Sequence, residues 1–175
     1  MRVFIDAKLV HAKSAERLPG SGVDLTRFRP TESPANSKTD SPIFLLVARM
    51  LWDKGIGEYV IAARTLRASY PQASFRLLGD VATANPSAIP RDQMDAWVKE
   101  GLITYLGSTE DVRPFVAEAD CVVLPSYREG VPRVLLEAAA MARPVITTDA
   151  PGCRDAVVDG ETGFICRPRD GADLA

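Results

Sequence analysis

The chain has 175 residues, a formal net charge of −2 and a sequence pI near 5.5. A chain of this length suits one domain that buries about 70% of the surface it exposes when unfolded, and its charge argues against nucleic-acid binding. No apolar run approaches the roughly 18 residues that indicate a transmembrane helix.

The first part of the sequence lacks a repeating strand–helix pattern. Met1–Val10 has enough apolar residues for one strand, but no signal-peptide core with a cleavage site. Gly20–Asp24 reads G-S-G-V-D, which is typical of a turn, and residues 31–42 are rich in Ser, Thr, Asn and Pro, which predicts a loop. The first central strand is expected to begin only after this loop.

Apolar runs alternate with helical periodicity through the rest of the chain, which is typical of an α/β fold with a parallel sheet. The runs that predict strands are Ile43–Ala48, Ser74–Leu78, Leu102–Leu106, Cys121–Leu124, Val145–Thr147 and Phe164–Cys166. Helices are expected over Gly57–Tyr70, from Asp92 to Glu100, from Ser108 or Thr109 to Ala119, from Pro132 to Arg143, and from Asp170 onward. The expected fold is therefore a doubly wound parallel sheet of the Rossmann-like kind.

Two of these helices have candidate N-cap residues. Asp92 is expected to cap one, and Ser108 or Thr109 the next, because short polar side chains accept hydrogen bonds from a helix start. Trp97 falls on the apolar face of its helix and is expected in the core.

Cysteine and histidine usage narrows the possible chemistry. Cys121, Cys153 and Cys166 have no metal-ligand spacing, and a thiol in a predicted core strand fits a reducing, cytoplasmic compartment best. The one histidine, His11, lies near the start of the chain, which excludes histidine catalysis within the main domain. Neither a G-x-G-x-x-G after the first strand nor a G-x-x-x-x-G-K-[ST] is present, which argues against a dinucleotide enzyme and a P-loop protein.

The segment from Asp120 to Asp149 organises the chain as strand, tight loop, helix and strand. Turn-forming residues fill Pro125–Val131, and Pro132 can occupy the first helical turn, where its missing N–H costs nothing. The segment carries two carboxylates, Glu129 in the loop and Glu137 on the helix, with seven residues between them.

Both carboxylates can face the crevice above the carboxyl ends of the strands, where open α/β sheets bind ligands. The helix start beside them offers free N–H groups and a positive dipole end, which suits a phosphate, and carboxylates accept hydrogen bonds from sugar hydroxyls. The pattern favours a sugar-nucleotide pocket. Taken singly, Glu129 could be a solvated loop residue and Glu137 could simply favour the helix dipole.

The string P-S-Y-R-E-G-V-P-R-V-L-L-E-A-A-A-M-A-R-P-V-I-T-T-D at Pro125–Asp149 resembles the signature of the family 4 retaining glycosyltransferases, with Glu129 and Glu137 as its two glutamates. G-S-G-V-D-L-T-R-F-R-P at Gly20–Pro30 resembles the hinge that joins the two domains of this family. The likeness extends over nearly the whole chain. It implies the C-terminal half of a GT-B fold and a hexosyltransferase-type enzyme. Such an enzyme moves a sugar from a nucleotide-sugar, expected to be a UDP-sugar, to a saccharide or lipid-linked saccharide with retention.

A second segment, Arg49–Gly55, resembles the family's G-R-x-x-x-x-K-G, with Ala48 in place of the usual glycine. The resemblance implies that Arg49 and Lys54 hold the diphosphate leaving group. Two cations at the carboxyl end of a strand can offset two phosphate charges, and arginine can bind phosphate in a fork. The alternative is that both are solvated surface cations.

The resemblance also implies roles for the remaining site residues. Glu137 would bind the ribose hydroxyls, and Glu129 would grip the donor sugar. The base would sit against main chain at Leu106–Thr109, and the loop Pro151–Asp155, which has Asp155 where Glu is usual, would approach the donor sugar unless it is a plain helix turn. The backbone of the helix start would bind the donor through Gly130, Val131, Arg133, Val134 and Leu135. No metal or other cofactor is expected.

By the same resemblance, residues 1–30 would be a remnant of an N-terminal acceptor domain with its hinge, and residues 31–175 a nucleotide-sugar-binding domain truncated at its C-terminus. The expected partners are the donor, the acceptor and the missing acceptor domain, without nucleic acid. The residues of these motifs resemble those of enzymes that assemble bacterial surface polysaccharides at the cytoplasmic face of the inner membrane. Two other interpretations stay open: a nucleotide-sugar-binding module without turnover, and a truncated product with no function.

Overall fold

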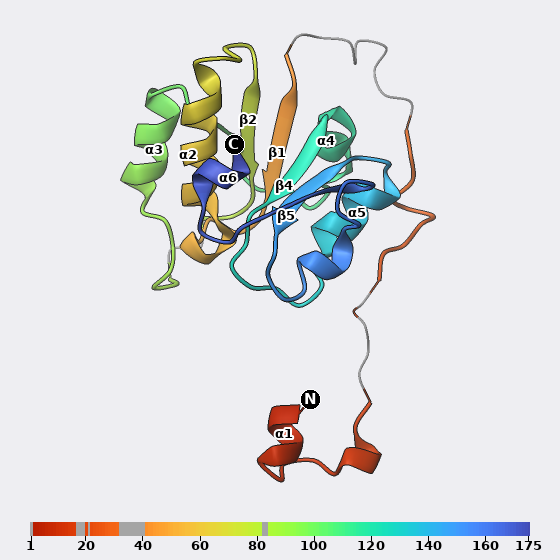
Figure 1. The fold of residues 1–175 in the computed structure, drawn as a ribbon. Coiled ribbons are helices and arrows are strands. Elements are labelled where there is room, and N and C mark those ends of the chain that lie inside the picture. The colour runs from red at the N-terminus through yellow and green to blue at the C-terminus, as the bar shows by residue number, and fades with distance from the viewer. Residues whose placement is uncertain (1, 17–19, 21, 32–40, 82–83) are drawn as a thin grey trace.

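A computed structural model describes residues 2–16, 20, 22–31, 41–81 and 84–175. Within them, one parallel sheet has the strand order β3-β2-β1-β4-β5-β6 (Figure 1). Its strands are β1 Ile43–Val47, β2 Ser74–Leu78, β3 Thr104–Tyr105, β4 Cys121–Leu124, β5 Val145–Thr148 and β6 Gly163–Cys166. The predicted doubly wound parallel sheet is confirmed, and its order reverses between the adjacent strands β1 and β4, where such folds bind ligands.

The helices are α1 Arg2–Asp6, α2 Ile56–Arg67, α3 Arg91–Lys99, α4 Arg113–Glu118, α5 Arg133–Ala140 and α6 Gly171–Leu174, with short 3-10 turns η1 Ala12–Ser14, η2 Trp52–Lys54 and η3 Arg154–Ala156. In Figure 1, α2, α3 and α6 lie toward one side of the sheet, and α4 and α5 toward the other. None of the helices in the described residues is long and apolar enough to cross a membrane.

Two cores result from the alternation of side chains along the strands. The core shared with α2 and α3 includes Leu46, Leu77, Val123, Tyr59, Met94 and Trp97. The core shared with α4 and α5 includes Leu45, Leu78, Val122, Leu124, Val116 and Leu135. Successive residues of β1 and β4 thus enter opposite cores, which is why these two strands read as unbroken apolar runs. The prediction that Trp97 is a core residue is confirmed.

The predicted N-terminal strand is wrong. Residues 2–6 form α1, in which the Ala7 N–H donates to the Val3 carbonyl at 3.0 Å. A lone strand leaves its backbone groups unpaired, whereas a helix pairs them internally. Of the other predictions for this region, Ser21 and residues 32–40 lie outside the described residues.

Two predicted N-caps are also wrong. Pro90 occupies the N-cap position of α3, with Asp92 inside the first turn. The Thr109 hydroxyl accepts from the Asp111 N–H at 3.1 Å and so closes a turn before α4, which begins only at Arg113. The strand β3 is shorter than predicted because the Leu102 N–H donates to the Trp97 carbonyl at the end of α3.

The helix α5 ends earlier than predicted, at Ala140, and Pro132 is its N-cap rather than part of its first turn. Its end is a Schellman motif, in which the Arg143 N–H donates to the Ala138 carbonyl at 2.9 Å and the Ala142 N–H to the Ala139 carbonyl at 3.0 Å. This motif requires a left-handed residue after the helix, and Ala142 takes that place with φ of 56°.

Ala142→Gly is therefore expected to stabilise the protein by about 0.5 to 1 kcal/mol, because glycine adopts the left-handed conformation without the Cβ clash. Urea denaturation measures the change. The matched control is Ala139→Gly on the exposed side of the same helix, which should lower stability by about 1 kcal/mol. Equal effects of the two substitutions would contradict the prediction.

Candidate functional site

The loops that follow β1, β4 and β5 meet at the carboxyl edge of the sheet, and glycines let them touch. A Cβ on Gly55 would overlap the Pro125 carbonyl, and one on Gly152 would overlap the Gly130 carbonyl. Both glycines have positive φ, 73° and 83°. The backbone of the loop before α5 is thus held between its two neighbours at the point where the strand order reverses.

Lys54 and Glu129 form the central ion pair of this edge. The Lys54 Nζ lies 2.6 Å from the Glu129 Oε1, and each side chain is 16% exposed. Lys54 closes η2 after β1, and Glu129 lies in the loop after β4, so the pairing depends on the adjacency of these two strands. The structure therefore brings together two of the three side chains that the sequence predicts to be catalytic.

Hydrogen bonds between neighbouring loops hold the Glu129 loop in place. The hydroxyl of the fully buried Ser126 and the N–H of Tyr127 both donate to the Asp53 carbonyl, at 3.1 and 3.0 Å. Thr148 at the end of β5 donates to the Ser126 carbonyl. The Glu129 N–H donates to the Pro151 carbonyl at 3.2 Å. Hydrogen bonds to the main chain of the neighbouring loops thereby hold the backbone around Glu129 in place.

Glu137 has different surroundings. It lines a hollow of about 340 Å³ together with Arg27, Phe28, Glu110, Val112, Arg133 and Val134. Its side chain is only 12% exposed, and its nearest ion-pair partner is the Arg133 guanidinium at 3.6 Å. Burial raises the pKa of Glu137, and the charges of Arg133 and Arg27 offset this only in part.

The remaining predicted residues divide between the two groups. Among the residues that the structure describes, Arg49 is exposed and forms no ion pair or side-chain hydrogen bond, and Lys54 and Glu129 are not among the residues that line the Glu137 hollow. Gly130 is exposed, and Val131 is half-buried beside Gly20, whose added Cβ would lie 3.2 Å from it. The predicted site residues thus fall into two groups of side chains, the Lys54–Glu129 pair and the lining of the Glu137 hollow.

The start of α5 offers fewer free donors than predicted. Leu135 is fully buried, and its N–H already donates to the Pro132 carbonyl at 3.1 Å. Within the described part of the chain, the Arg133 and Val134 N–H groups have no acceptor, so these two remain able to bind a phosphate. Leu135 thus stays a predicted backbone ligand, one whose N–H is already engaged within the first turn of α5.

Four residues that line the hollow were not predicted from the sequence. Glu110 and Val112 lie one and three residues after the predicted base-binding turn Leu106–Thr109. Arg27 and Phe28 belong to the hinge-like string, which packs on the core under α4 and α5 through Phe28 and Val23. Asp155 is exposed in η3 and does not line the hollow.

In the part of the chain described, no group of three or more His, Cys, Asp or Glu side chains is placed to hold a metal ion. The three cysteines are buried and free, and burial raises the pKa of Cys121 to about 12.

Comparisons with known proteins identify the family. A family model described as glycosyl transferases group 1 matches residues 41–175. One relative, the N,N'-diacetylbacillosaminyl-diphospho-undecaprenol alpha-1,3-N-acetylgalactosaminyltransferase of Campylobacter jejuni, is 30% identical over 163 residues, 88% of this chain and 41% of the relative. Another, the glycogen synthase of Mycobacterium tuberculosis, is 31% identical over 161 residues, 89% of this chain and 37% of the relative. The chain thus spans about two fifths of the length of these relatives.

Solved structures share the fold. The sucrose-phosphate synthase of Thermosynechococcus elongatus superposes with a TM-score of 0.76 at 28% identity, covering 99% of this chain and 44% of that one. Anabaena HepE in complex with UDP gives 0.80 at 22% identity, covering 99% and 49%, a likeness that shows the fold alone. The C-terminal domain of LpcC, a glycosyl transferase group 1 family protein from Francisella tularensis, gives 0.70 at 26% identity and covers 88% of this chain and 84% of that domain.

The close approach at Gly152 is testable by a pair of alanine substitutions. Gly152→Ala is expected to lower the free energy of unfolding by about 1 to 3 kcal/mol more than Gly160→Ala, because the added methyl overlaps the Gly130 carbonyl. Gly160 has nearly the same φ, 76°, but nothing lies within 4 Å of an added Cβ, so it isolates the cost of the left-handed backbone. Similar losses for both, measured by urea denaturation, would rule out the close approach.

The burial of Glu137 predicts a pH dependence. Because its pKa is raised in the folded state, the folded protein binds more protons than the unfolded chain just above the ordinary carboxyl range, and this residue lowers stability as the pH rises. Glu137→Gln is expected to stabilise the protein at neutral pH, and the gain should shrink as the pH falls through the Glu137 pKa. Urea denaturation between about pH 4 and pH 8 measures this. Glu161→Gln, at an exposed carboxylate, is the control, and a pH-independent gain at Glu137 would contradict the prediction.

Proposed function

The chain belongs to the group 1 glycosyl transferases, and we propose that it forms the donor-binding half of a family 4 enzyme. The enzyme transfers a sugar from a nucleotide-sugar, a UDP-sugar being the expected donor, to a saccharide or lipid-linked saccharide with retention of configuration. The name of the Campylobacter relative refers to a saccharide linked to diphospho-undecaprenol, and this supports a lipid-linked acceptor.

The observation that carries this proposal is the ion pair at the carboxyl edge of the sheet, in which the Lys54 Nζ lies 2.6 Å from the Glu129 Oε1. A cation there can take up the charge that builds on the diphosphate when it leaves, and electrostatic help of this kind is often the largest contribution to catalysis. Glu129 can accept hydrogen bonds from the hydroxyls of the sugar that is being transferred. Arg49, exposed in the loop after β1, would add a second cation.

The charges around the two groups of side chains indicate how a donor would lie. The rim of the Glu137 hollow has two arginines and two glutamates over apolar side chains, so its formal charge is balanced. A balanced rim suits the neutral nucleoside, whose ribose diol would donate to Glu137. The diphosphate would extend from there to the free N–H groups of Arg133 and Val134 and on to Lys54.

In the reaction that we propose, the bond between the sugar and the diphosphate oxygen breaks, and a bond from the sugar to the acceptor oxygen forms on the same face. The acceptor hydroxyl passes its proton to the departing diphosphate. The residues of this chain bind and orient the donor and stabilise the leaving group, and none is assigned as a covalent nucleophile. The acceptor would come from the other domain of the whole protein.

A second candidate function is a nucleotide-sugar-binding module without turnover. The C-terminal domain of LpcC, which this chain covers to 84%, has been solved by itself, so a domain of this extent can fold alone. A transfer assay with and without an added N-terminal half separates the two candidates. Turnover that requires the added half supports the enzyme.

Isothermal titration with UDP tests the site. Lys54→Ala and Glu137→Ala are each expected to weaken UDP binding by at least about 1 kcal/mol, roughly fivefold, because each removes a charge-assisted hydrogen bond. Lys99→Ala, at an exposed lysine at the end of α3, is the matched control and should leave the affinity unchanged. Unchanged affinity in both site variants would refute the assignment.

A further inference from the structure

The loop that carries Glu129 has no regular secondary structure, so its shape depends on its contacts. The bonds from the Tyr127 N–H to Asp53 and from the Glu129 N–H to Pro151 hold its main chain. Main-chain bonds alone do not decide which carboxylate the Lys54 ammonium selects. The side chain of Tyr127 makes a further hydrogen bond, which affects which carboxylate pairs with Lys54.

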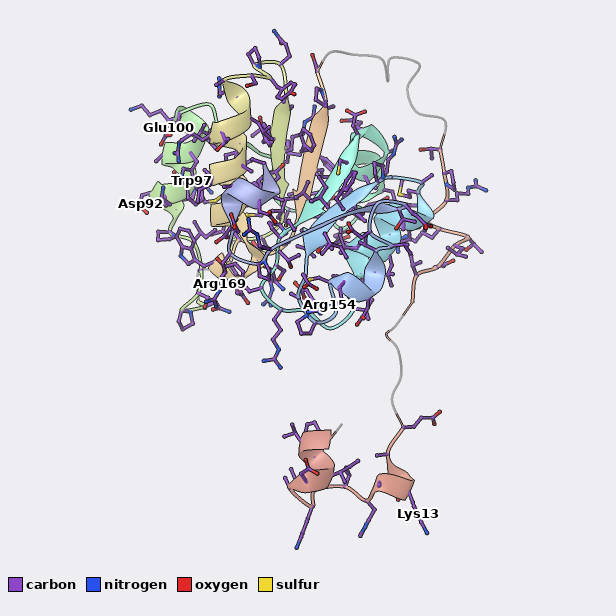
Figure 2. The ribbon with its side chains drawn as sticks, viewed as in Figure 1. Lys13, Asp92, Trp97, Glu100, Arg154 and Arg169 are labelled. Atoms are coloured by element: carbon purple, nitrogen blue, oxygen red, sulfur yellow. The ribbon has the colours of Figure 1, made fainter. Side chains whose placement is uncertain are left out.

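Tyr127 links the Glu129 loop to α2. Its hydroxyl lies 2.8 and 2.9 Å from the two carboxylate oxygens of Glu58, in the first turn of that helix. The Arg169 guanidinium covers its ring at 4.7 Å from the centroid. Figure 2 shows Arg169 at the carboxyl edge of the sheet, in the segment between β6 and α6. Three segments that are distant in sequence thus meet at Tyr127.

Glu58 is a natural rival of Glu129 for Lys54. Its hydrogen-bond partner Tyr127 lies two residues before Glu129, so Lys54 and Glu58 both bind side chains of the same short loop. The Tyr127 hydroxyl instead shares its single proton between the two carboxylate oxygens of Glu58, at 2.8 and 2.9 Å. Burial, reinforced by the hydrogen bond to Glu58, raises the pKa of Tyr127 to about 12, so the phenol keeps the proton that it donates.

We propose that Tyr127 is a positioning residue, which engages the Glu58 carboxylate and thereby leaves the Lys54 ammonium to Glu129. Two donor–carboxylate pairs result side by side, Tyr127 with Glu58 and Lys54 with Glu129. The pairing itself follows from the geometry, and its consequence for sugar binding rests on the proposed function. Loss of the phenol hydroxyl frees Glu58 to compete for Lys54 and releases Glu129 from its place.

The pairing is testable without a ligand, from the NMR signal of the Lys54 ammonium, assigned with Lys54→Arg. In the wild-type protein, Glu129→Gln is expected to shift this signal and Glu58→Gln to leave it in place. In the Tyr127→Phe background, Glu58→Gln is expected to shift it. A signal that responds to Glu129→Gln alone in both backgrounds would overturn the proposal.

The consequence for the donor is tested by isothermal titration with UDP and with a panel of UDP-hexoses and UDP-N-acetylhexosamines. Tyr127→Phe is expected to reduce the gain in affinity that the sugar adds to UDP by about three- to tenfold, the loss of one hydrogen bond. The double variant Tyr127→Phe/Glu58→Gln should restore that gain, because the rival carboxylate is gone. Tyr105→Phe, which removes a phenol bond to the Gly79 carbonyl at the end of β2, should leave the gain unchanged.

These outcomes separate the two hypotheses. If the wild-type protein binds no UDP, the proposed function fails, and the NMR comparison still decides the pairing. If UDP-sugars bind and Tyr127→Phe leaves the sugar gain unchanged, or if the double variant does not restore it, the positioning role fails while the donor site stands.

Discussion

The ion pair between Lys54 and Glu129 is the contact that the carboxyl edge of this domain is built around. Both side chains are largely withdrawn from water, and a buried pair seldom repays the cost of removing its charges from solvent. Stability alone therefore does not explain it. A lysine whose partner is a carboxylate rather than a fixed main-chain carbonyl can exchange that partner for an incoming phosphate, which suits a site that must bind and release an anion.

The placement of this pair depends on backbone contact between loops. Gly55 touches the Pro125 carbonyl and Gly152 the Gly130 carbonyl, so the Glu129 loop is enclosed by the loops that follow β1 and β5. The adjacency of β1 and β4 brings these loops together, and the buried Ser126 and Thr148 hydroxyls fasten them. Close contacts of main chain on main chain thus set the position of the Glu129 loop.

The sequence was informative wherever one segment determines its own structure. Unbroken apolar runs identified the central strands because these are buried on both faces, and the spacing of Glu129 and Glu137 identified the loop and helix that carry them. It was least informative at helix starts, where Asp92 and Thr109 have cap-forming side chains but main chain or a local turn takes the cap's place. The motifs predicted that Lys54 and Glu129 both lie at the carboxyl edge of the sheet, and the structure places them 2.6 Å apart there. The Tyr127–Glu58 bond instead joins two segments that no local pattern connects.

The two glutamates of the motif differ in a way that their spacing does not reveal. Glu129 is compensated by a lysine at 2.6 Å, whereas Glu137 has only a guanidinium at 3.6 Å that is itself 67% exposed, and burial raises its pKa. A carboxylate with unfilled acceptor capacity gains most from neutral hydroxyl donors, because they satisfy its lone pairs without adding a charge that must be desolvated. A carboxylate that is already paired with a cation, such as Glu129 with Lys54, instead suits hydroxyl groups that lie next to a phosphate. For the proposed donor, Glu137 would therefore suit the neutral nucleoside, and Glu129 with Lys54 would suit the anionic diphosphate with its sugar.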